Sequence, residues 1–130
     1  MNSKFFLAGI APLMLAILLS ACSKDDDGQP PAQSRQVKLE VTGNYTGTVH
    51  LLYTNAPGGT QNDQITLPFT KNITYEPSVM AIVFALAGNG GAAGQTVRIK
   101  VTIGNTAKTP VEKTVDATGN FSFSTPGYTF

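Results

Sequence analysis

The feature that most constrains the fold of this chain is a strict alternation of apolar and polar side chains over residues 96–104, TVRIKVTIG. Branched apolar residues occupy every second position, at Val97, Ile99, Val101 and Ile103. Successive side chains of a β-strand point to opposite faces, so a period of two predicts a strand with one buried and one solvated face. The polar residues between them, which include Arg98 and Lys100, are expected to face water.

The same period of two recurs in short segments along the rest of the chain. We expect strands at residues 37–41, 48–54, 64–69, 72–76, 78–88, 96–104, 111–115 and 121–125. Turn residues separate them at intervals of about ten residues, which is typical of all-β domains. The predicted fold class is therefore all-β, an antiparallel immunoglobulin-like β-sandwich of seven or eight strands over residues 36–130.

Several segments carry more specific expectations. Pro68 has no N–H to donate, so the strand at 64–69 should lie at a sheet edge or end there. Residues 78–88, SVMAIVFALAG, are apolar on both faces, which favours a central strand, although their length also fits a short buried helix. The glycine-rich stretch 88–94 is expected to be a mobile turn, and Thr118–Asn120 a hairpin turn.

The tyrosines allow two interpretations. If Tyr45, Tyr53, Tyr75 and Tyr128 lie exposed on one sheet face, they can stack on a sugar or contact a partner protein. The alternative is that they fill or flank the core, as tyrosines commonly do when their hydroxyl finds a hydrogen-bond partner.

The N-terminus has the pattern of a secretory signal. Lys4 precedes an apolar run at residues 5–19, which is short for a membrane-spanning helix. The sequence LSAC that follows, ending at Cys22, resembles the lipobox of bacterial lipoproteins. That resemblance implies a signal peptide over 1–21, cleavage between Ala21 and Cys22, and a lipid on Cys22 that anchors the chain to a membrane. An uncleaved anchor helix is the alternative.

An acidic cluster follows the cysteine, made of Ser23, Lys24, Asp25, Asp26 and Asp27. Contiguous aspartates lack the alternate spacing of an EF-hand loop, so a solvated spacer is a better interpretation than a calcium site. The cluster also resembles the export signal of Bacteroidota lipoproteins, which implies an outer-membrane location on the cell surface, or otherwise on the periplasmic face. Residues 22–35 are expected to form the lipidated start and a proline-containing linker.

Composition excludes several classes of function. The formal net charge is +1, so no basic field directs the chain to nucleic acid. Cys22 is the only cysteine and His50 the only histidine, which argues against a structural zinc site. We expect His50 to be a surface or cross-strand residue. The carboxylates of the globular part are scattered, at Glu40, Asp63, Glu76, Glu112 and Asp116. We therefore predict no catalytic residues, no cofactor and no metal site.

Four stretches of the globular part resemble a known family. They are LEVTG (39–43), LLYTNAPGGTQ (51–61), ITLPF (65–69) and VRIKVTIGN (97–105), which are similar in order and spacing to the periplasmic domain of the mycobacterial MmpS family. The resemblance covers about residues 37–125. It implies a small immunoglobulin-like sandwich without catalysis that assists RND-type exporters of lipids and siderophores.

Two features depart from that family. Its members are usually held by a transmembrane helix, whereas this chain resembles a lipoprotein, and many members carry cysteines where this chain has none. Phe121 and Phe123 are expected to fill the core instead. The predicted function is a non-catalytic, membrane-anchored lipoprotein that serves as a cell-envelope binding or accessory module. An RND-exporter adaptor and a carbohydrate-binding module are the alternatives, with a transporter, another envelope protein or a glycan as partner.

Overall fold

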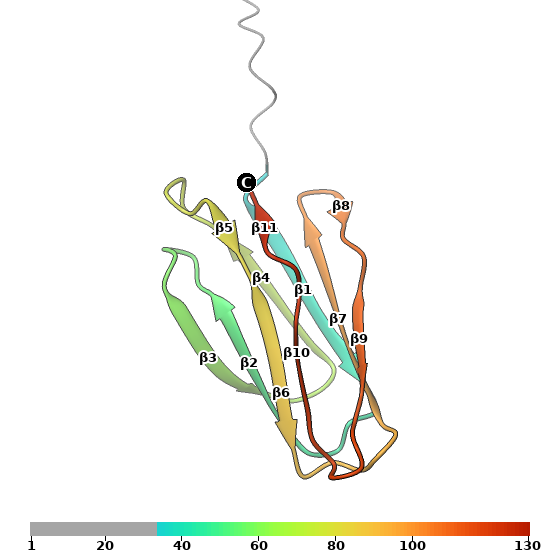
Figure 1. Ribbon diagram of the computed structural model, residues 1–130. Coiled ribbons are helices and arrows are strands. Elements are labelled where there is room, and N and C mark those ends of the chain that lie inside the picture. Colours follow the sequence, from blue (N-terminus) through green and yellow to red (C-terminus); the bar gives the residue numbers. More distant parts are fainter. Residues whose placement is uncertain (1–33) are drawn as a thin grey trace, which may run out of the picture. The chain divides into compact units, whose positions relative to one another are not determined.

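The computed structural model describes residues 34–130. The predicted signal peptide, Ala21, Cys22 and the acidic cluster 23–27 lie outside the described residues. The described part consists of strands and loops (Figure 1), and it contains no helix long and apolar enough to cross a membrane. Its strands are β1 (Gln36–Gly43), β2 (Thr48–Thr54), β3 (Thr60–Ile65), β4 (Phe69–Thr74), β5 (Ala81–Ile82), β6 (Phe84–Asn89), β7 (Thr96–Ile103), β8 (Thr106–Ala107), β9 (Val111–Thr114), β10 (Phe121–Ser124) and β11 (Tyr128–Thr129).

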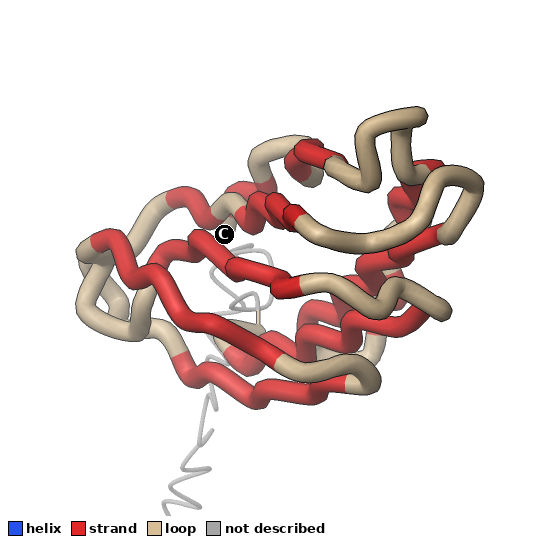
Figure 2. Tube along the Cα trace, turned by 90° about the horizontal axis from the view of Figure 1, so that it is seen from below, coloured by secondary structure: helices blue, strands red, loops and turns tan. Residues whose placement is uncertain are grey.

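Two antiparallel sheets make up the sandwich, which confirms the predicted all-β fold class. A five-stranded sheet has the order β4-β1-β7-β8, with β9 also paired to β7, and a four-stranded sheet has the order β10-β6-β2-β3. The two-residue strands β5 and β11 pair with each other. Figure 2 shows the domain from below, with the strands in red and the loops that join them in tan. The immunoglobulin-like topology stays a prediction.

The core lies between the two sheets and is filled by the side chains that the alternation placed inward. In β7, Val97, Ile99 and Val101 are at most 1% exposed. The inward residues of β1 and β2 are equally well buried, and they are Val37, Leu39, Val41, Val49, Leu51 and Tyr53. Full burial of one aliphatic side chain contributes about 1.5–3 kcal/mol, so this set dominates the stability of the domain. Phe121 is also buried and Phe123 is partly buried against the core, as predicted.

The predicted strand at 64–69 is wrong as a single element. β3 ends at Ile65 and β4 begins at Phe69, and the two strands belong to different sheets. Pro68 cannot continue a ladder of backbone hydrogen bonds, so the chain leaves one sheet before it and enters the other after it. β3 and β4 are both edge strands, which agrees with the edge position expected for this segment.

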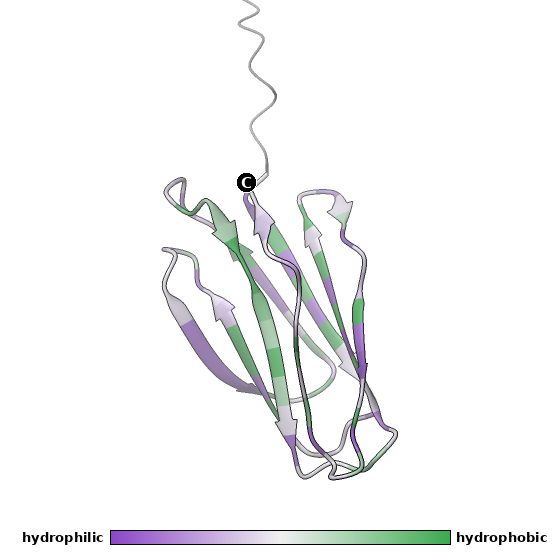
Figure 3. Cartoon of the chain, in the orientation of Figure 1, coloured by the Kyte–Doolittle hydropathy of each residue, from purple (hydrophilic) through white to green (hydrophobic). Residues whose placement is uncertain are grey.

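The apolar segment 78–88 is also divided. β5 ends at Ile82 and β6 begins at Phe84, because the N–H of Val83 donates to Thr54 Oγ1 (3.3 Å) instead of a ladder carbonyl. β6 lies between β10 and β2, so the central position is confirmed and the helix alternative is excluded. Figure 3 shows β6 as the most continuously green strand and β3 as the most purple.

The turn at Thr118–Asn120 does not close a hairpin. β9 precedes it in the five-stranded sheet, and β10 follows it in the four-stranded sheet. The carboxylate of Asp116 accepts the backbone N–H groups of Thr118 (2.8 Å) and Asn120 (3.0 Å), and so holds the turn. The turn therefore carries the chain from one sheet to the other.

The first described residues and the C-terminus lie at the same end of the sandwich (Figure 1). Arg35 Nη1 donates to the carbonyl oxygens of Glu76 (3.0 Å) and Val79 (2.6 Å), and the guanidinium stacks 4.8 Å from the ring centroid of Phe130. The β1–β2, β3–β4 and β6–β7 loops lie at the opposite end. The start of the described chain therefore lies far from those loops.

Candidate functional site

The outer faces of the two sheets differ in charge. The outward residues of the five-stranded sheet include five ionised side chains, Lys38, Glu40, Arg98, Lys100 and Glu112, and we call this the charged face. The outward residues of the four-stranded sheet carry no Asp, Glu, Lys or Arg. They are Thr48, His50, Leu52, Thr54, Thr60, Asn62, Gln64, Ala85, Ala87, Asn89, Ser122 and Ser124, and we call this the uncharged face.

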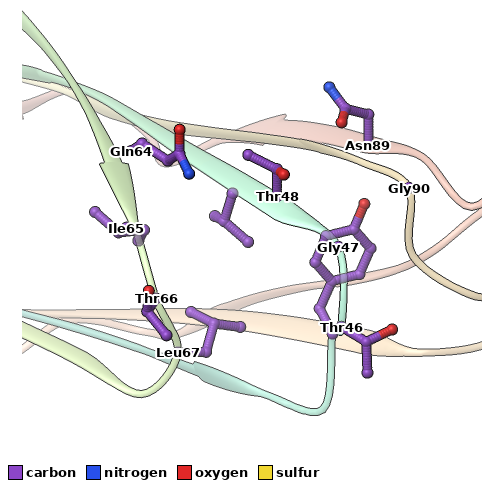
Figure 4. Close-up of a pocket in the computed structure, with 11 residues that line it drawn as sticks. Thr46, Gly47, Thr48, Gln64, Ile65, Thr66, Leu67, Asn89 and Gly90 are labelled. Carbon is purple, nitrogen blue, oxygen red and sulfur yellow. The ribbon is translucent and has the colours of Figure 1, made fainter.

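A pocket of about 440 Å³ opens at the end of the uncharged face (Figure 4), and we call it the end pocket. It is built by the start of β2, the end of β3 and the end of β6, together with the loops that follow or precede them. Its lining contains no Asp, Glu, Lys, Arg or His, and consists of Tyr45, Thr46, Gly47, Thr48, Val49, Gln64, Ile65, Thr66, Leu67, Asn89 and Gly90. The polar groups that it offers are hydroxyls, carboxamides and backbone groups.

Four polar side chains of the end pocket are not used by the fold. Among the hydrogen bonds within residues 34–130, none involves the side-chain polar atoms of Thr48, Gln64, Thr66 or Asn89. Gln64, Thr66 and Asn89 are exposed and Thr48 is half-buried, so water satisfies these groups in the free protein. They are available to a ligand that replaces this water.

Most other carboxamides near the loops hold backbone structure instead. Asn44 Oδ1 accepts the N–H of Thr96 (2.8 Å), and Asn55 Oδ1 accepts the N–H of Gly59 (2.7 Å). Gln95 Oε1 accepts the N–H groups of Ala92 (2.9 Å) and Thr46 (3.2 Å). The amides of Gln64 and Asn89 hold no backbone structure, a property that they share with exposed carboxamides elsewhere such as Asn62 and Asn72, and they differ from Asn72 in lining the end pocket.

Tyr45 supports the wall of the end pocket and ties three loops together. Its hydroxyl donates to the carbonyl of Gly119 (2.9 Å) and accepts the N–H of Gly91 (3.2 Å), and its ring meets Phe121 edge-on at 4.9 Å between centroids. A Cβ added at Gly91 would come within 2.0 Å of the Tyr45 ring. Gly88 and Gly91 thus allow the backbone to pack closely against the Tyr45 ring, a role that the sequence did not predict for this stretch.

A second depression of about 250 Å³, which we call the trough, lies next to the end pocket on the uncharged face. Its base is formed by the small side chains Ala85 and Ala87 of β6, next to Leu52 of β2, which is 45% exposed. His50, Asn62 and Ser122 line its sides. The two depressions are neighbours, because His50 of the trough pairs in register with Gln64 of the end pocket.

A polar cluster closes the open edge of the sandwich between β3 and β4. The carboxylate of Asp63 accepts the hydroxyl of Tyr53 (2.9 Å) and Nε2 of Gln61 (3.0 Å), and Lys71 Nζ lies 3.7 Å from it. The hydrogen bonds from Gln61 and Tyr53 hold the pKa of Asp63 below its ordinary value of 3.8. Tyr53 and Asp63 raise the pKa of Lys71. These groups satisfy one another, so the cluster serves the fold.

The structure decides between the two interpretations of the tyrosines. Tyr45, Tyr53 and Tyr75 are at most 7% exposed and belong to the core, and Tyr128 packs against it. Burial raises the pKa of the Tyr75 hydroxyl, which donates to the carbonyl of Thr54 (2.7 Å). The hypothesis of an exposed tyrosine platform is therefore wrong. His50 lies on the outward side of β2, as predicted.

Among residues 34–130, no group of three or more His, Cys, Asp or Glu side chains is placed to hold a metal ion. Comparison with protein-family models, with curated proteins and with solved structures finds no match for this chain. Its site must therefore be interpreted from its own geometry.

The residues of the end pocket were not recognised in the sequence. The alternation in 48–54 and 64–69 placed Thr48 and Gln64 outward, and that was the available signal. Neither alternation nor turn chemistry indicates that β2, β3 and β6 are neighbours, so the convergence of their polar ends could not be predicted.

Proposed function

We propose that this chain is a non-catalytic binding module of the bacterial cell envelope, anchored to the outer membrane by a lipid on Cys22. The observation that carries the proposal is the position of the end pocket. It opens at the end of the sandwich opposite Ser34, the residue at which the predicted linker reaches the domain. The point at which the predicted linker joins the domain therefore leaves the pocket uncovered.

The chemistry of the pocket supports binding rather than catalysis. Its lining offers no carboxylate, imidazole or ammonium group to move a proton, and no thiol or paired serine as nucleophile. Outside the pocket, the Asp63 carboxylate is engaged by Tyr53 and Gln61. The proposal therefore assigns no reaction to the domain.

The anchor is tested by replacing Cys22 with Ser in the full-length chain expressed in a Bacteroidota host. We expect loss of labelling by a clickable palmitate analogue, accumulation of the precursor, and loss of the mature protein from the outer-membrane fraction. Ser20→Ala is the matched control, because it keeps a small residue and leaves the cysteine in place. Unchanged labelling and membrane retention of Cys22→Ser would contradict the proposal.

The acidic cluster is tested separately. Replacement of Asp25, Asp26 and Asp27 by Asn should leave lipid labelling intact but protect the protein from protease added to whole cells. Equal protease sensitivity of variant and wild type would reject the cell-surface assignment and keep the anchor.

A second candidate is an adaptor of an RND-type exporter, as the resemblance to the MmpS family implies. The observation that favours it is the exposure of two apolar side chains, Leu52 of β2 (45%) and Val83 between β5 and β6 (44%). An adaptor should co-purify with the exporter after crosslinking, and Leu52→Asp should abolish that association.

A further inference from the structure

We infer that the end pocket binds a sugar residue of a neutral glycan, and that further sugars of the same glycan lie in the trough along the uncharged face. The inference rests on the proposed function as a binding module and specifies its ligand class. It is carried by three properties of the described residues: the free carboxamides, the absence of Asp, Glu, Lys and Arg from both linings, and the adjacency of the end pocket and the trough.

The free polar groups match the hydroxyls of a sugar. A carboxamide has two donors and an acceptor that are held in one plane, and a threonine hydroxyl both donates and accepts. A pair of neighbouring sugar hydroxyls needs this mixture of donors and acceptors. Gln64 and Asn89 supply two carboxamides, and Thr48 and Thr66 supply two hydroxyls, all without a partner among the hydrogen bonds of residues 34–130.

The absence of charge selects against other ligands. An anionic ligand such as a phosphate or uronate is expected to meet Arg or Lys, and none lines the end pocket or the trough. A cationic ligand or a metal ion needs carboxylates, which are also absent from both linings. A neutral ligand avoids the large cost of desolvating an unpaired charge of the protein in such a site.

The dimensions and the order of the side chains fit a chain of sugars. The volume of the end pocket, about 440 Å³, lies within the range of small-molecule sites, roughly 300–1,000 Å³. From Thr48, successive outward residues of β2 lead to His50 and Leu52 at intervals of about 6.8 Å. Ala85 and Ala87 keep the surface beside them low. The C–H faces of sugars can therefore pack on Leu52 and the alanines, while Asn62 and Ser122 meet hydroxyls.

A protein partner fits the same face less well. The centre of a protein interface is enriched in aromatic residues, Met and Arg. The outward positions of β2, β3, β6 and β10 carry none of these, and Leu52 is their only large aliphatic side chain. A surface of small and neutral polar side chains is better matched to a hydrated, neutral polymer.

The test uses the full-length, lipidated protein captured on lipid-coated biosensor chips. Mannan, dextran, xylan and galactomannan are the neutral probes, and heparin and polygalacturonate are the charged ones. Polymers are chosen over monosaccharides because no aromatic side chain of this face stacks on a sugar, so single-site affinity is low and avidity makes binding measurable. We expect the protein to bind at least one neutral polymer. Its affinity should be the same at 0.05 and 0.5 M NaCl, because a contact between neutral groups is not screened by salt. Gln64→Ala and Asn89→Ala should each weaken the affinity about 2- to 12-fold.

Asn72→Ala is the matched control, because Asn72 is an exposed carboxamide on the outer side of β4, in the other sheet. It should leave glycan binding unchanged. Gln64→Glu keeps the size of the side chain and adds a charge, so it should weaken binding without loss of folding, which circular dichroism checks.

Four results would overturn the inference. The folded protein binds none of the neutral polymers, or it binds only the charged ones. Asn72→Ala weakens glycan binding as much as Gln64→Ala does, or the domain binds a protein whose affinity is abolished by Leu52→Asp and unchanged by Gln64→Ala. None of them bears on the anchor, whose failure appears only in the Cys22→Ser experiment. Failure of the ligand class and failure of the envelope function are thus distinguishable.

Discussion

The two outer faces of this sandwich are built by the same alternation and differ only in what occupies the outward positions. On the charged face, Glu40 lies 3.2 Å from Lys38 and 3.9 Å from Lys100, and Arg98 pairs in register with Glu112. On the uncharged face, the corresponding positions hold Thr, Ser, Asn, Gln and Ala together with His50 and Leu52. Charged side chains keep the first face solvated, whereas the second can exchange its water for a neutral ligand at low cost in desolvation.

Both faces rest on the same core, so the difference between them concerns recognition rather than stability. The predictions below test that separation, from the largest expected effect to the smallest.

Leu51 and Leu52 are neighbours in β2 on opposite sides of the four-stranded sheet, with 0% and 45% exposure. Leu51→Ala should lower the free energy of unfolding by about 2–5 kcal/mol, because it leaves a cavity in the core. Leu52→Ala should change it by about 0.5 kcal/mol or less. Urea denaturation of both variants measures the difference. Comparable losses would show that the uncharged face is structurally required and not free for a ligand.

A comparison of Tyr45 with Gln64 distinguishes the residues that hold the wall of the end pocket from the polar groups that the fold does not use. Tyr45→Phe removes the hydroxyl that joins Gly91 and Gly119 and should cost about 1 kcal/mol in free energy of unfolding. Gln64→Ala, at the mouth of the same pocket, should cost less than about 0.5 kcal/mol. Thermal unfolding compares them, and a larger loss for Gln64→Ala would mean that its amide is needed by the fold.

A substitution of Glu40 tests how much the ion pairs of the charged face contribute to the free energy of unfolding. Glu40→Gln removes both ion pairs, and since these side chains are 30–48% exposed the free energy of unfolding should fall by less than about 1 kcal/mol. The small difference should shrink as NaCl is raised from 0.05 to 0.5 M. A loss that does not depend on salt would show that Glu40 acts through packing and not through charge.

The edge of the sandwich and the β9–β10 turn make the fold sensitive to acid. Hydrogen bonds hold the pKa of Asp63 and of Asp116 below their ordinary value of 3.8. Each carboxylate therefore stabilises the native state above about pH 4, and this contribution is lost as the pH falls through the lowered pKa. Melting temperatures from pH 7 to 2.5 should fall most steeply below pH 4 and less steeply in Asp63→Asn. A parallel curve for Asp63→Asn would contradict the role of this cluster.

Much of the fold could be predicted because alternation is a local property. Val97, Ile99 and Val101 were expected to be buried from their spacing, and they are. The wrong predictions concern segments whose hydrogen-bond partners are strands far away in the sequence. The strand expected at 64–69 is divided at Pro68, and the turn at Thr118–Asn120 joins two sheets instead of closing a hairpin.

The candidate site was harder to predict for the same reason. The sequence indicates that Thr48 and Gln64 point outward, and nothing in it indicates that Asn89 pairs with Thr48. The tyrosines illustrate the opposite error, because their side chains suit an exposed platform as well as a core. Their hydroxyls found backbone partners in the interior, at Gly119 for Tyr45 and at Thr54 for Tyr75.

The sequence by itself determined that this chain forms short, one-sided strands, because a side-chain period of two depends only on neighbouring residues. It also predicts a lipid anchor at Cys22, because LSAC resembles a lipobox and such a motif is read from the linear sequence. The tertiary structure alone decided which strands are neighbours and therefore which polar side chains share a pocket. Pairing depends on contacts between residues far apart in the chain, and Gln64 and Asn89 line one pocket only after β2 has paired with both β3 and β6.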